Sequence, residues 1–396
     1  MPSASPGAEG NVVSGERPPS RRQRFRRFRF IVYGVTALLQ VVPALGASVV
    51  VSGSAAAALG ALALLVTLRV LGAVVSDGRR PAVRVVVLDE PVLAHWCASL
   101  LATLLFLPSL PAAGIVSRLA SLSFGSAVRG AAAFVYVASL AAAVWGFTAG
   151  RRRIAVTHVE IPIVGLDEEL DGYRILQVSD LHIGNFDTKD RGFAWAARVN
   201  ALAPDLVAVT GDLVTAGSTF YPDVAAVLGR LSGKDGVFVS LGNHDQSNPD
   251  ALAQLIALEG PTVLRNSSRV VSRGAARLVV AGLDDRMTGR DDLARTLSGR
   301  VPGAPTVLLS HYPDFFEEAA SAGVDLVLSG HTHGGQIGVP FFSKRWSLSR
   351  LARQHAPGLH IRGHSRLYVN AGLGTTGPPV RFGVAPEISV FTLRSA

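Results

Sequence analysis

The sequence predicts an α/β fold in its second half, preceded by an all-helical membrane region of about four spans. In the second half, short runs of four to six apolar residues recur, and each ends in a polar cluster. Amphipathic helical patterns lie between several of these runs. Apolar runs bounded by Gly and Asp are typical of strands buried on both faces, and their alternation with helices is typical of an α/β sheet. In the first half, long apolar runs carry almost no charge.

The composition of the 396 residues agrees with this division. Hydrophobic residues make up 48% of the chain and charged residues only 17%, against about 25% charged residues in an ordinary soluble domain. These values exclude a disordered chain, and the single cysteine excludes a disulfide-stabilised miniprotein. Residues 1–150 hold 13 arginines, no lysine and five acids, a charge of +8, whereas residues 151–396 hold 25 basic and 24 acidic residues. The excess charge therefore lies beside apolar runs, where it indicates membrane topology rather than nucleic-acid binding.

Four apolar runs predict four membrane spans. No charged residue occurs from Ile31 to Leu68, a run long enough for two helices of about 20 residues each, and Val51–Ser54 is the expected turn. The four expected spans are residues 31–50, 55–75, 91–116 and 131–148. Pro108 and Pro111 are expected near the end of the third span, because proline interrupts helices.

The placement of arginines predicts the orientation of these spans. Six arginines lie within residues 21–29, just before the first span, three lie between the second and third spans, and three directly follow the fourth. They are Arg21, Arg22, Arg24, Arg26, Arg27 and Arg29; Arg79, Arg80 and Arg84; and Arg151, Arg152 and Arg153. Since positive charge favours the cytoplasmic side, both termini and residues 151–396 are expected in the cytoplasm. An alternative is a twin-arginine export signal at Ser20–Gln23, which would place the second half outside the cell.

The expected organisation has three parts. Residues 1–30 form a disordered basic tail, residues 31–150 a transmembrane helical region, and residues 151–396 the α/β domain. We expect a multi-pass protein of the cell membrane, the inner or plasma membrane of its cell.

Polar clusters directly follow five of the predicted strands. They are Asp180-Leu181-His182, Gly211-Asp212, Gly242-Asn243-His244-Asp245, His311 and Gly330-His331-Thr332-His333. In α/β sheets, ligands bind in the crevice beyond the carboxyl ends of the strands. Clusters scattered over about 150 residues can therefore converge on one point.

The residue types in these clusters indicate a metal site. Oxygen donors are combined with imidazole nitrogens and no thiolate, which favours Mn²⁺, Fe or Zn²⁺ over a structural cysteine zinc site. The seven candidate metal ligands are Asp180, His182, Asp212, Asn243, His311, His331 and His333. Seven ligands are too many for one catalytic ion, but they fit two divalent ions that share a bridging carboxylate. Two ions about 3.5–4 Å apart are the usual means of phosphoester hydrolysis.

The order of these motifs resembles the calcineurin-like metallophosphoesterase superfamily over about residues 155–393. Some segments are similar to its membrane-linked bacterial branch: Gly330–Gln336 and Tyr368–Thr375, followed by Pro378, Arg381 and Pro386–Ile388. The resemblance implies a four-layer α-β-β-α sandwich of two stacked sheets flanked by helices. It makes residues 151–396 the catalytic domain and does not extend to the first half of the chain.

The resemblance also implies a role for each site residue. Asp180, His182 and His333 would hold the first metal ion, and Asn243, His311 and His331 the second. Asp212 would bridge the two ions. His244 would contact the phosphoryl group or the leaving oxygen, as a charge stabiliser or general acid. Asp245 would orient His244, since a catalytic imidazole needs a partner for its other nitrogen.

We therefore expect a membrane-anchored, binuclear-metal phosphoesterase that hydrolyses phosphodiester, phosphomonoester or pyrophosphate bonds. Lipid-linked or cell-envelope substrates fit, because a site tethered beside the bilayer meets them at high effective concentration.

The alternative is a membrane sensor or transporter with a regulatory metal- or phosphate-binding domain. Against transport, the spans contain few polar residues, chiefly Gln40, Arg69 and His95. A nucleic-acid substrate is not expected, because the catalytic half is nearly neutral. Asn185 lies close to His182 and fits either a phosphate contact or a turn.

Overall fold

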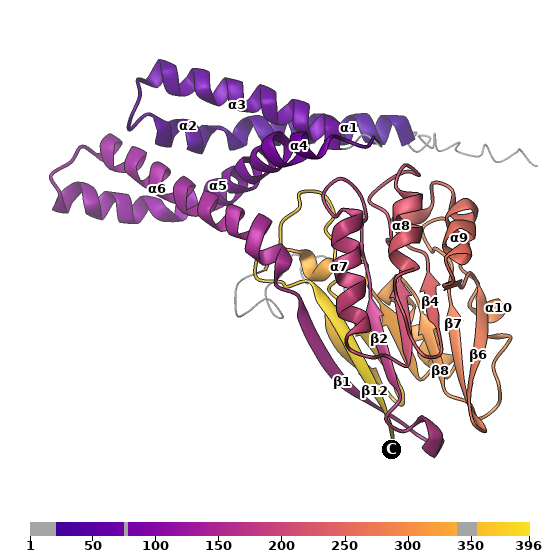
Figure 1. Cartoon of the computed structure of the whole chain (residues 1–396). Helices are drawn as coiled ribbons and strands as arrows, with labels where there is room; N and C mark the ends of the chain where they lie inside the picture. The colour runs from indigo at the N-terminus through magenta and orange to yellow at the C-terminus, as the bar shows by residue number, and fades with distance from the viewer. Residues whose placement is uncertain (1–20, 75–77, 339–354) are drawn as a thin grey trace, which may run out of the picture.

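The computed structural model describes residues 21–74, 78–338 and 355–396, and for residues 21–29 only the backbone. It has an elongated helical part and an α/β part that lies against one side of it (Figure 1). The helices of the first part are α1 (Arg21–Leu39), α2 (Val41–Ala47), α3 (Gly53–Val74), α4 (Ala82–Arg84), α5 (Glu90–Leu119) and α6 (Phe124–Trp145). One π-helical turn, Val85–Asp89, joins α4 to α5, and another, Gly146–Gly150, extends α6.

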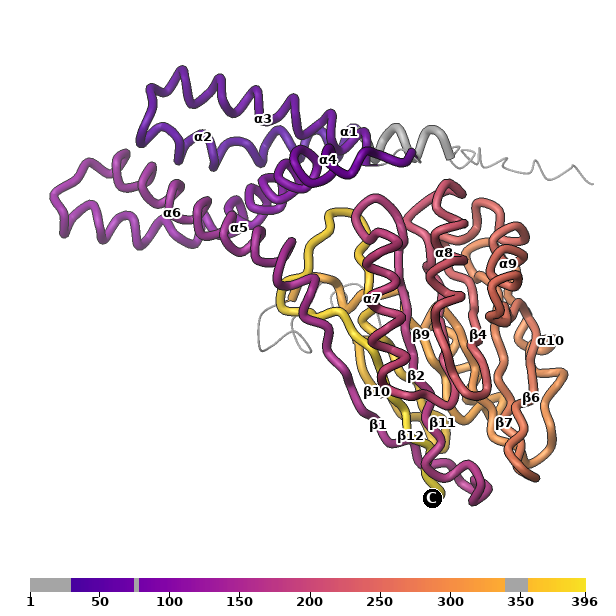
Figure 2. Tube along the Cα trace, viewed as in Figure 1, coloured from indigo at the N-terminus to yellow at the C-terminus, as the bar shows by residue number. Residues whose placement is uncertain are grey.

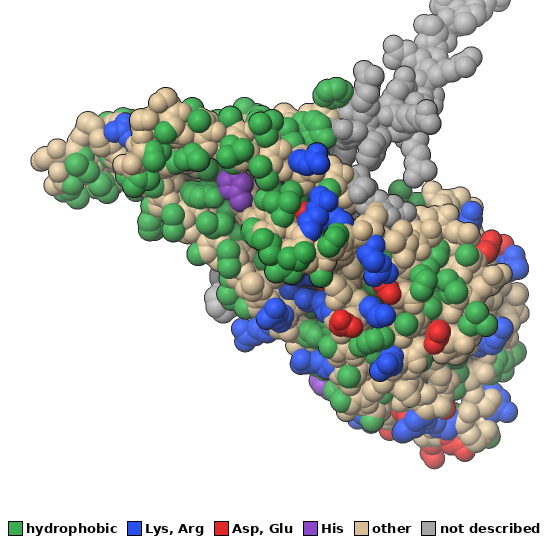
Figure 3. Space-filling view, turned by 45° about the horizontal axis from the view of Figure 1, so that its top comes forward, with side chains coloured by type: hydrophobic (Ala, Val, Ile, Leu, Met, Phe, Trp, Pro, Cys, Tyr) green, Lys and Arg blue, Asp and Glu red, His purple; other side chains and the backbone are tan. Residues whose placement is uncertain are grey.

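Among the described residues, four helical segments of this part are long and apolar enough to cross a membrane, as predicted. They are Phe30–Ala47, Gly53–Val74, Ala82–Leu119 and Phe124–Gly150. Their outward side chains are apolar: Leu59, Leu62 and Leu65 of α3 are each more than half exposed. Hydrophobic side chains dominate the visible face of the helical part (Figure 3). An apolar surface of this size is stable in lipid rather than in water.

The helices differ from the sequence expectation at two places. Residues 21–30 were expected in a disordered tail, but α1 already begins at Arg21, because arginine is a good helix former and continues the span beyond its apolar part. Residues 1–20 of that tail lie outside the described residues. Pro108 and Pro111 lie inside α5 rather than at its end. Proline is tolerated within membrane helices, where neighbouring groups satisfy the freed backbone carbonyls.

Polar side chains join the helices inside the bundle. Nδ1 of His95, in α5, lies 2.7 Å from the Tyr136 hydroxyl of α6. Nε2 of His95 lies 3.0 Å from Oε1 of the Gln40 side chain. Gly46 of α2 lies so close to α6 that a Cβ atom there would come within 2.9 Å of the Ala133 backbone. Small residues and interhelical hydrogen bonds of this kind are what hold membrane helices together.

The α/β part contains two six-stranded mixed sheets. The first has the order β1-β12-β2-β3-β4-β5 and the second the order β10-β11-β9-β8-β7-β6. The strands of the first sheet are β1 (Ala155–Ile163), β12 (Glu387–Ser395), β2 (Arg174–Val178), β3 (Leu206–Thr210), β4 (Val237–Ser240) and β5 (Thr262–Val263). Those of the second are β10 (Gly358–Arg362), β11 (Ser365–Val369), β9 (Leu326–Ser329), β8 (Thr306–Leu309), β7 (Ala276–Gly282) and β6 (Ser267–Arg273).

The two sheets pack face to face, with helices in front of the first sheet (Figures 1 and 2) and short helices packed on the outer face of the second, which confirms the predicted four-layer sandwich. Alternate residues of each strand face opposite sides: Leu206 and Ala208 of β3 pack between the sheets, whereas Val207 and Val209 pack against helices. Helices α7 (Lys189–Asn200), α8 (Tyr221–Leu228) and α9 (Pro249–Leu258) cover the first sheet. Helix α11 (Phe316–Ser321), with the short α10 (Leu293–Leu297), covers the second.

The central strands of each sheet are parallel, so their carboxyl ends lie at one edge. Strands β2, β3 and β4 run in parallel in the first sheet, and β7, β8, β9 and β11 in the second. The loops after β2 and β11 contact the helical part through Asn185 and Arg381. The strand ends that carry the polar clusters therefore face the membrane helices.

Candidate metal centre

The predicted metal ligands converge at the carboxyl ends of β2, β3, β8 and β9. Asp180, His182, Asp212 and His333 offer ligand atoms that all lie within 4.8 Å of one another. Asp212, His311 and His331 form a second group by the same measure. Asp212 belongs to both groups, which is the arrangement expected of a carboxylate between two cations.

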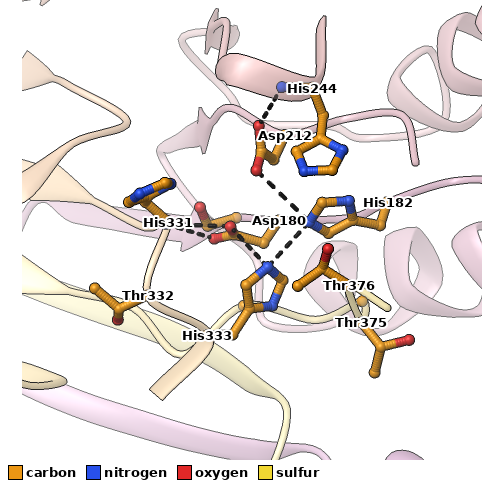
Figure 4. Close-up of polar contacts among 12 residues, drawn as sticks. Asp180, His182, Asp212, His244, His331, Thr332, His333, Thr375 and Thr376 are labelled. Carbon is orange, nitrogen blue, oxygen red and sulfur yellow. Dashed lines mark hydrogen bonds and ion pairs between the residues drawn. The ribbon is translucent and has the colours of Figure 1, made fainter. Parts of the chain in front are cut away.

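In the first group, two imidazole nitrogens face each other beside two carboxylates (Figure 4). Nε2 of His182 lies 3.0 Å from Nε2 of His333 and 3.6 Å from Oδ2 of Asp212. Nε2 of His333 lies 3.3 Å from Oδ1 of Asp180. Burial lowers the pKa of His182 to about 3, and burial together with His182 lowers the pKa of His333 well below its usual range. Both rings are therefore neutral, the state in which an imidazole nitrogen binds a metal.

In the second group, the His311 ring lies between the Thr210 carbonyl and the Asp212 carboxylate. Its Nδ1 donates to the Thr210 carbonyl at 2.8 Å, and its Nε2 lies 3.3 Å from Oδ2 of Asp212 and 3.2 Å from Nδ1 of His331. Burial disfavours the charged forms of both His311 and Asp212, but the attraction between the two charges is larger than this effect. The pKa of His311 is raised to about 10, and that of Asp212 is lowered well below its usual range. Asp212 is thus a fully ionised acceptor in a buried position, as a bridge between cations requires.

Asn243 lies in the 3-10 turn after β4, beside the second group. The Tyr312 hydroxyl lies 3.1 Å from Asn243 Oδ1 and 3.2 Å from Oδ1 of the buried Asp285, and the Tyr312 ring packs on the His331 ring. Tyr312 and Asp285 therefore hold Asn243 beside this group. The sequence reasoning missed Tyr312, although its position directly after His311 was a usable signal.

His244 also lies beside Asp212, but Asp245 does not orient it. The backbone N–H of His244 donates to Asp212 Oδ1 at 2.9 Å, and its ring Nδ1 contacts the Thr215 carbonyl. The Asp245 carboxylate instead accepts from the N–H groups of Gly242, at 2.8 Å, and Leu213, at 2.9 Å. The prediction that Asp245 orients the His244 ring is therefore wrong. A buried N–H group without an acceptor is costly, and Asp245 supplies the acceptor for this turn.

The backbone at the ligand positions is held in an unfavourable conformation. Asp180, His182, Asp212, His331 and His333 all have positive φ values, between 46° and 69°. Each such residue costs of order 1–3 kcal/mol and persists only where surrounding contacts impose it. Here the backbone N–H of Asp180 donates to the Gly211 carbonyl and that of His182 to the Asp212 carbonyl, both at 3.0 Å. Concentration of this strain at one point is characteristic of functional sites.

Two motif glycines allow the loops to approach this closely. A Cβ atom on Gly242 would lie 2.3 Å from Oδ1 of Asp212, and one on Gly330 would lie 2.3 Å from Oδ2 of Asp180. Any larger residue at either position would displace a ligand carboxylate.

Similarity to known proteins agrees with this geometry. The profile of the calcineurin-like phosphoesterase family matches residues 173–335, which include every predicted site residue. The uncharacterized metallophosphoesterase YkuE of Bacillus subtilis is 35% identical over 230 residues, which are 57% of this chain and 80% of that protein. This chain belongs to the calcineurin-like metallophosphoesterase family. It is therefore a metal-dependent hydrolase of phosphoric esters, as predicted.

Longer metallophosphoesterases with membrane segments are also similar to it. The transmembrane protein with metallophosphoesterase domain of Danio rerio is 32% identical over 272 residues, 64% of this chain and 60% of that protein. Its Bos taurus counterpart is 30% identical over 259 residues, 61% of this chain and 57% of that protein. The chain thus spans less than two thirds of these two relatives. A membrane-linked metallophosphoesterase is the arrangement that the apolar helices of this chain also indicate.

Proposed function

We propose that the protein is a membrane-bound phosphodiesterase that uses two divalent metal ions, Mn²⁺, Fe or Zn²⁺, to hydrolyse membrane-linked substrates. The observation that carries this proposal is the pair of ligand groups joined by Asp212. Asp180, His182 and His333 would hold one ion, Asn243, His311 and His331 the other, and Asp212 both. Bound ions would supply an activated water and neutralise the phosphoryl charge.

His244 is the residue of this chain best placed to move a proton. Its Nδ1–H donates to the Thr215 carbonyl, which leaves Nε2 for the substrate. The side chain is only half-buried, unlike that of His182, with which its ring packs edge to face at a centroid distance of 4.6 Å. A proton on Nε2 would stabilise the phosphoryl oxygens and pass to the leaving oxygen as its bond to phosphorus breaks. Asp212 fixes His244 by accepting its backbone N–H.

The position of the site supports a membrane-linked substrate. The ligands lie on the edge of the sandwich that faces the membrane helices, and the loop after β2 reaches Gly78 between the second and third spans. A headgroup in that leaflet would meet the site without leaving the bilayer, at a high effective concentration. Phospholipids, lipid-linked sugar pyrophosphates and cell-envelope polymers are the substrate classes that fit.

A chelator is expected to abolish hydrolysis by the full-length protein in detergent, and Mn²⁺, Fe²⁺ or Zn²⁺ to restore it, since the bound ions would activate the water and neutralise the phosphoryl charge. The measurement is the rate on a panel of phospholipids, a lipid pyrophosphate, an aryl phosphodiester and an aryl phosphomonoester, with and without EDTA. Faster turnover of the lipid diesters than of the soluble ones is the expected result. Equal rates with EDTA present would refute the metal mechanism, and a preference for the monoester would refute the diesterase assignment.

We propose in addition that the catalytic domain lies in the cytoplasm, because Arg79, Arg80 and Arg151, from two of the arginine clusters, contact it directly. A reporter fused after Ala396 is expected to be active if it requires the cytoplasm and inactive if it requires export. As a control, the same reporters inserted in the short turn after Val51, on the opposite side, are expected to give the reverse pattern. Export-dependent activity after Ala396 would show that the orientation is inverted.

A further inference from the structure

The loop that follows His182 docks onto the membrane helices at two points. Asn185 accepts a hydrogen bond from the Arg80 backbone N–H at 2.8 Å and donates one to the Gly78 carbonyl at 2.9 Å. The next residue, Phe186, packs beneath the Arg80 guanidinium, 5.0 Å from it, and its carbonyl accepts from Arg151 at 2.9 Å. Asn185 is therefore a docking residue in this structure rather than a phosphate contact.

Asp187 is the centre of this junction. Its side chain is buried, with an exposed fraction of 1%. Oδ1 accepts from Nη2 of Arg151 at 3.0 Å and lies 3.1 Å from Nε of Arg191. Oδ2 accepts from the backbone N–H of Thr375 at 2.9 Å and from its hydroxyl at 2.8 Å. Arg151 is itself 3% exposed and pairs with Glu90, at the start of α5, at 3.2 Å. One carboxylate thus connects the end of the last membrane helix to the loop after β11.

That loop supports Asp180 directly. The backbone N–H of Leu373 donates to the Ser179 carbonyl at 3.0 Å, and that of Gly374 donates to the Asp180 carbonyl at 2.8 Å. Thr375, the residue bound to Asp187, is the next in the chain. The loop is therefore hydrogen-bonded to the backbone of Asp180, and Asp187 holds the next residue of the loop, Thr375.

A second connection leads from α6 to His333. The buried Arg381 donates through its guanidinium to the carbonyls of His333, at 3.2 Å, Ala371, at 2.7 Å, and Gly372, at 3.1 Å. Its backbone N–H donates to the Gly146 carbonyl at 3.2 Å, in the turn that extends α6. The same helix end therefore supports both Asp180 and His333.

We infer that Arg151 and Asp187 are positioning residues for the metal ion held by Asp180, His182 and His333, so that the end of the last membrane helix is a structural part of that ion site. This inference rests on the ligand assignment in the proposed function. Two ligands of the other ion are supported from within the α/β part, His311 by the Thr210 carbonyl and Asn243 by Tyr312 and Asp285, whereas the backbone N–H of His331 donates to the Asp180 carboxylate at 3.1 Å. Damage to the junction should therefore weaken binding of the first ion more than that of the second.

The test is an equilibrium titration of the full-length protein in detergent with Mn²⁺, which counts bound ions and gives their affinities. Arg151→Lys keeps the positive charge needed for insertion but loses the planar fork that reaches Glu90, Phe186 and Asp187 at once. We expect one ion to bind about 10–100-fold more weakly, the usual effect of removing a group that orients metal ligands. Arg153→Lys, at an exposed position two residues on, is the matched control and should leave both affinities unchanged.

A second pair of variants lies outside the helical part. Thr375→Val removes the hydroxyl bonded to Asp187 and should weaken the same ion, whereas Thr375→Ser keeps the hydroxyl and should restore its affinity. If Arg151→Lys does not fold, this pair decides the question alone. Unchanged affinities in Thr375→Val, or equal losses in Thr375→Val and Thr375→Ser, would overturn the inference. The titration measures binding of Mn²⁺, so absence of phosphodiester hydrolysis would refute the proposed function without altering this result.

Discussion

Replacement of Asp212 by alanine is expected to remove both bound metal ions and to lower phosphodiester hydrolysis by roughly 10³-fold or more. The carboxylate is shared by both ligand groups, so its loss leaves the first group with one carboxylate, that of Asp180, and the second group with none. The ions are expected to contribute several kcal/mol of transition-state stabilisation. The measurement is metal content per chain after desalting, together with the rate on an aryl phosphodiester.

The matched control for this variant is Asp190→Ala. Asp190 is an exposed acid in the first turn of α7, so its replacement changes the net charge equally without reaching the site. The control should keep both ions and the full rate. Retention of two ions by Asp212→Ala would show that Asp212 is not the bridge.

Replacement of His244 by alanine is expected to separate catalysis from metal binding. The ring is not a member of either ligand group, and its backbone N–H, which Asp212 accepts, remains in the variant. Metal content should therefore be unchanged, while kcat falls by about 10²–10⁴-fold, the usual contribution of a general acid or base. Steady-state rates on an aryl phosphodiester and metal analysis of the same preparation provide the measurement.

The control for this variant is His158→Ala, an exposed histidine on β1. It should behave as the unchanged protein in both measurements. An undiminished rate in His244→Ala would exclude the proposed proton transfer. Loss of metal in His244→Ala would instead show that the histidine holds the site together.

The sequence predicted those parts of the site that depend on local pattern. Each apolar strand is followed directly by its polar residues, and parallel strands bring their carboxyl ends together, so Asp180 and Asp212 were expected to meet. His311 follows β8 of the second sheet and reaches Asp212 only because the two sheets stack. The four-layer arrangement followed from the resemblance of the motifs to a family. The four apolar helices were predictable because length and hydropathy alone decide whether a helix can span lipid.

Contacts between distant segments could not be predicted in this way. Asp245 adjoins His244 in sequence, yet its carboxylate turns to the backbone of the loop after β3. Asp187 is not part of a recognisable sequence motif, because its partners, Arg151 and Thr375, lie far from it in the sequence, near the two ends of the catalytic region. In the sequence, Arg151 indicates only membrane topology, since a count of charges cannot show that a side chain is buried in an ion pair.

The two-point attachment of the catalytic domain also limits which molecules can react. Contacts at Gly78–Arg80, between the second and third spans, and at Arg151, directly after the fourth, hold the domain at two separate points rather than on a single flexible linker. Such an attachment would hold the domain at a fixed distance from the bilayer. For a substrate anchored in lipid, the reach of the headgroup above the membrane surface becomes a criterion of selection, independent of the chemistry of the pocket. Such an enzyme would select substrates first by the distance of the phosphate from the membrane surface and only then by the groups bonded to it.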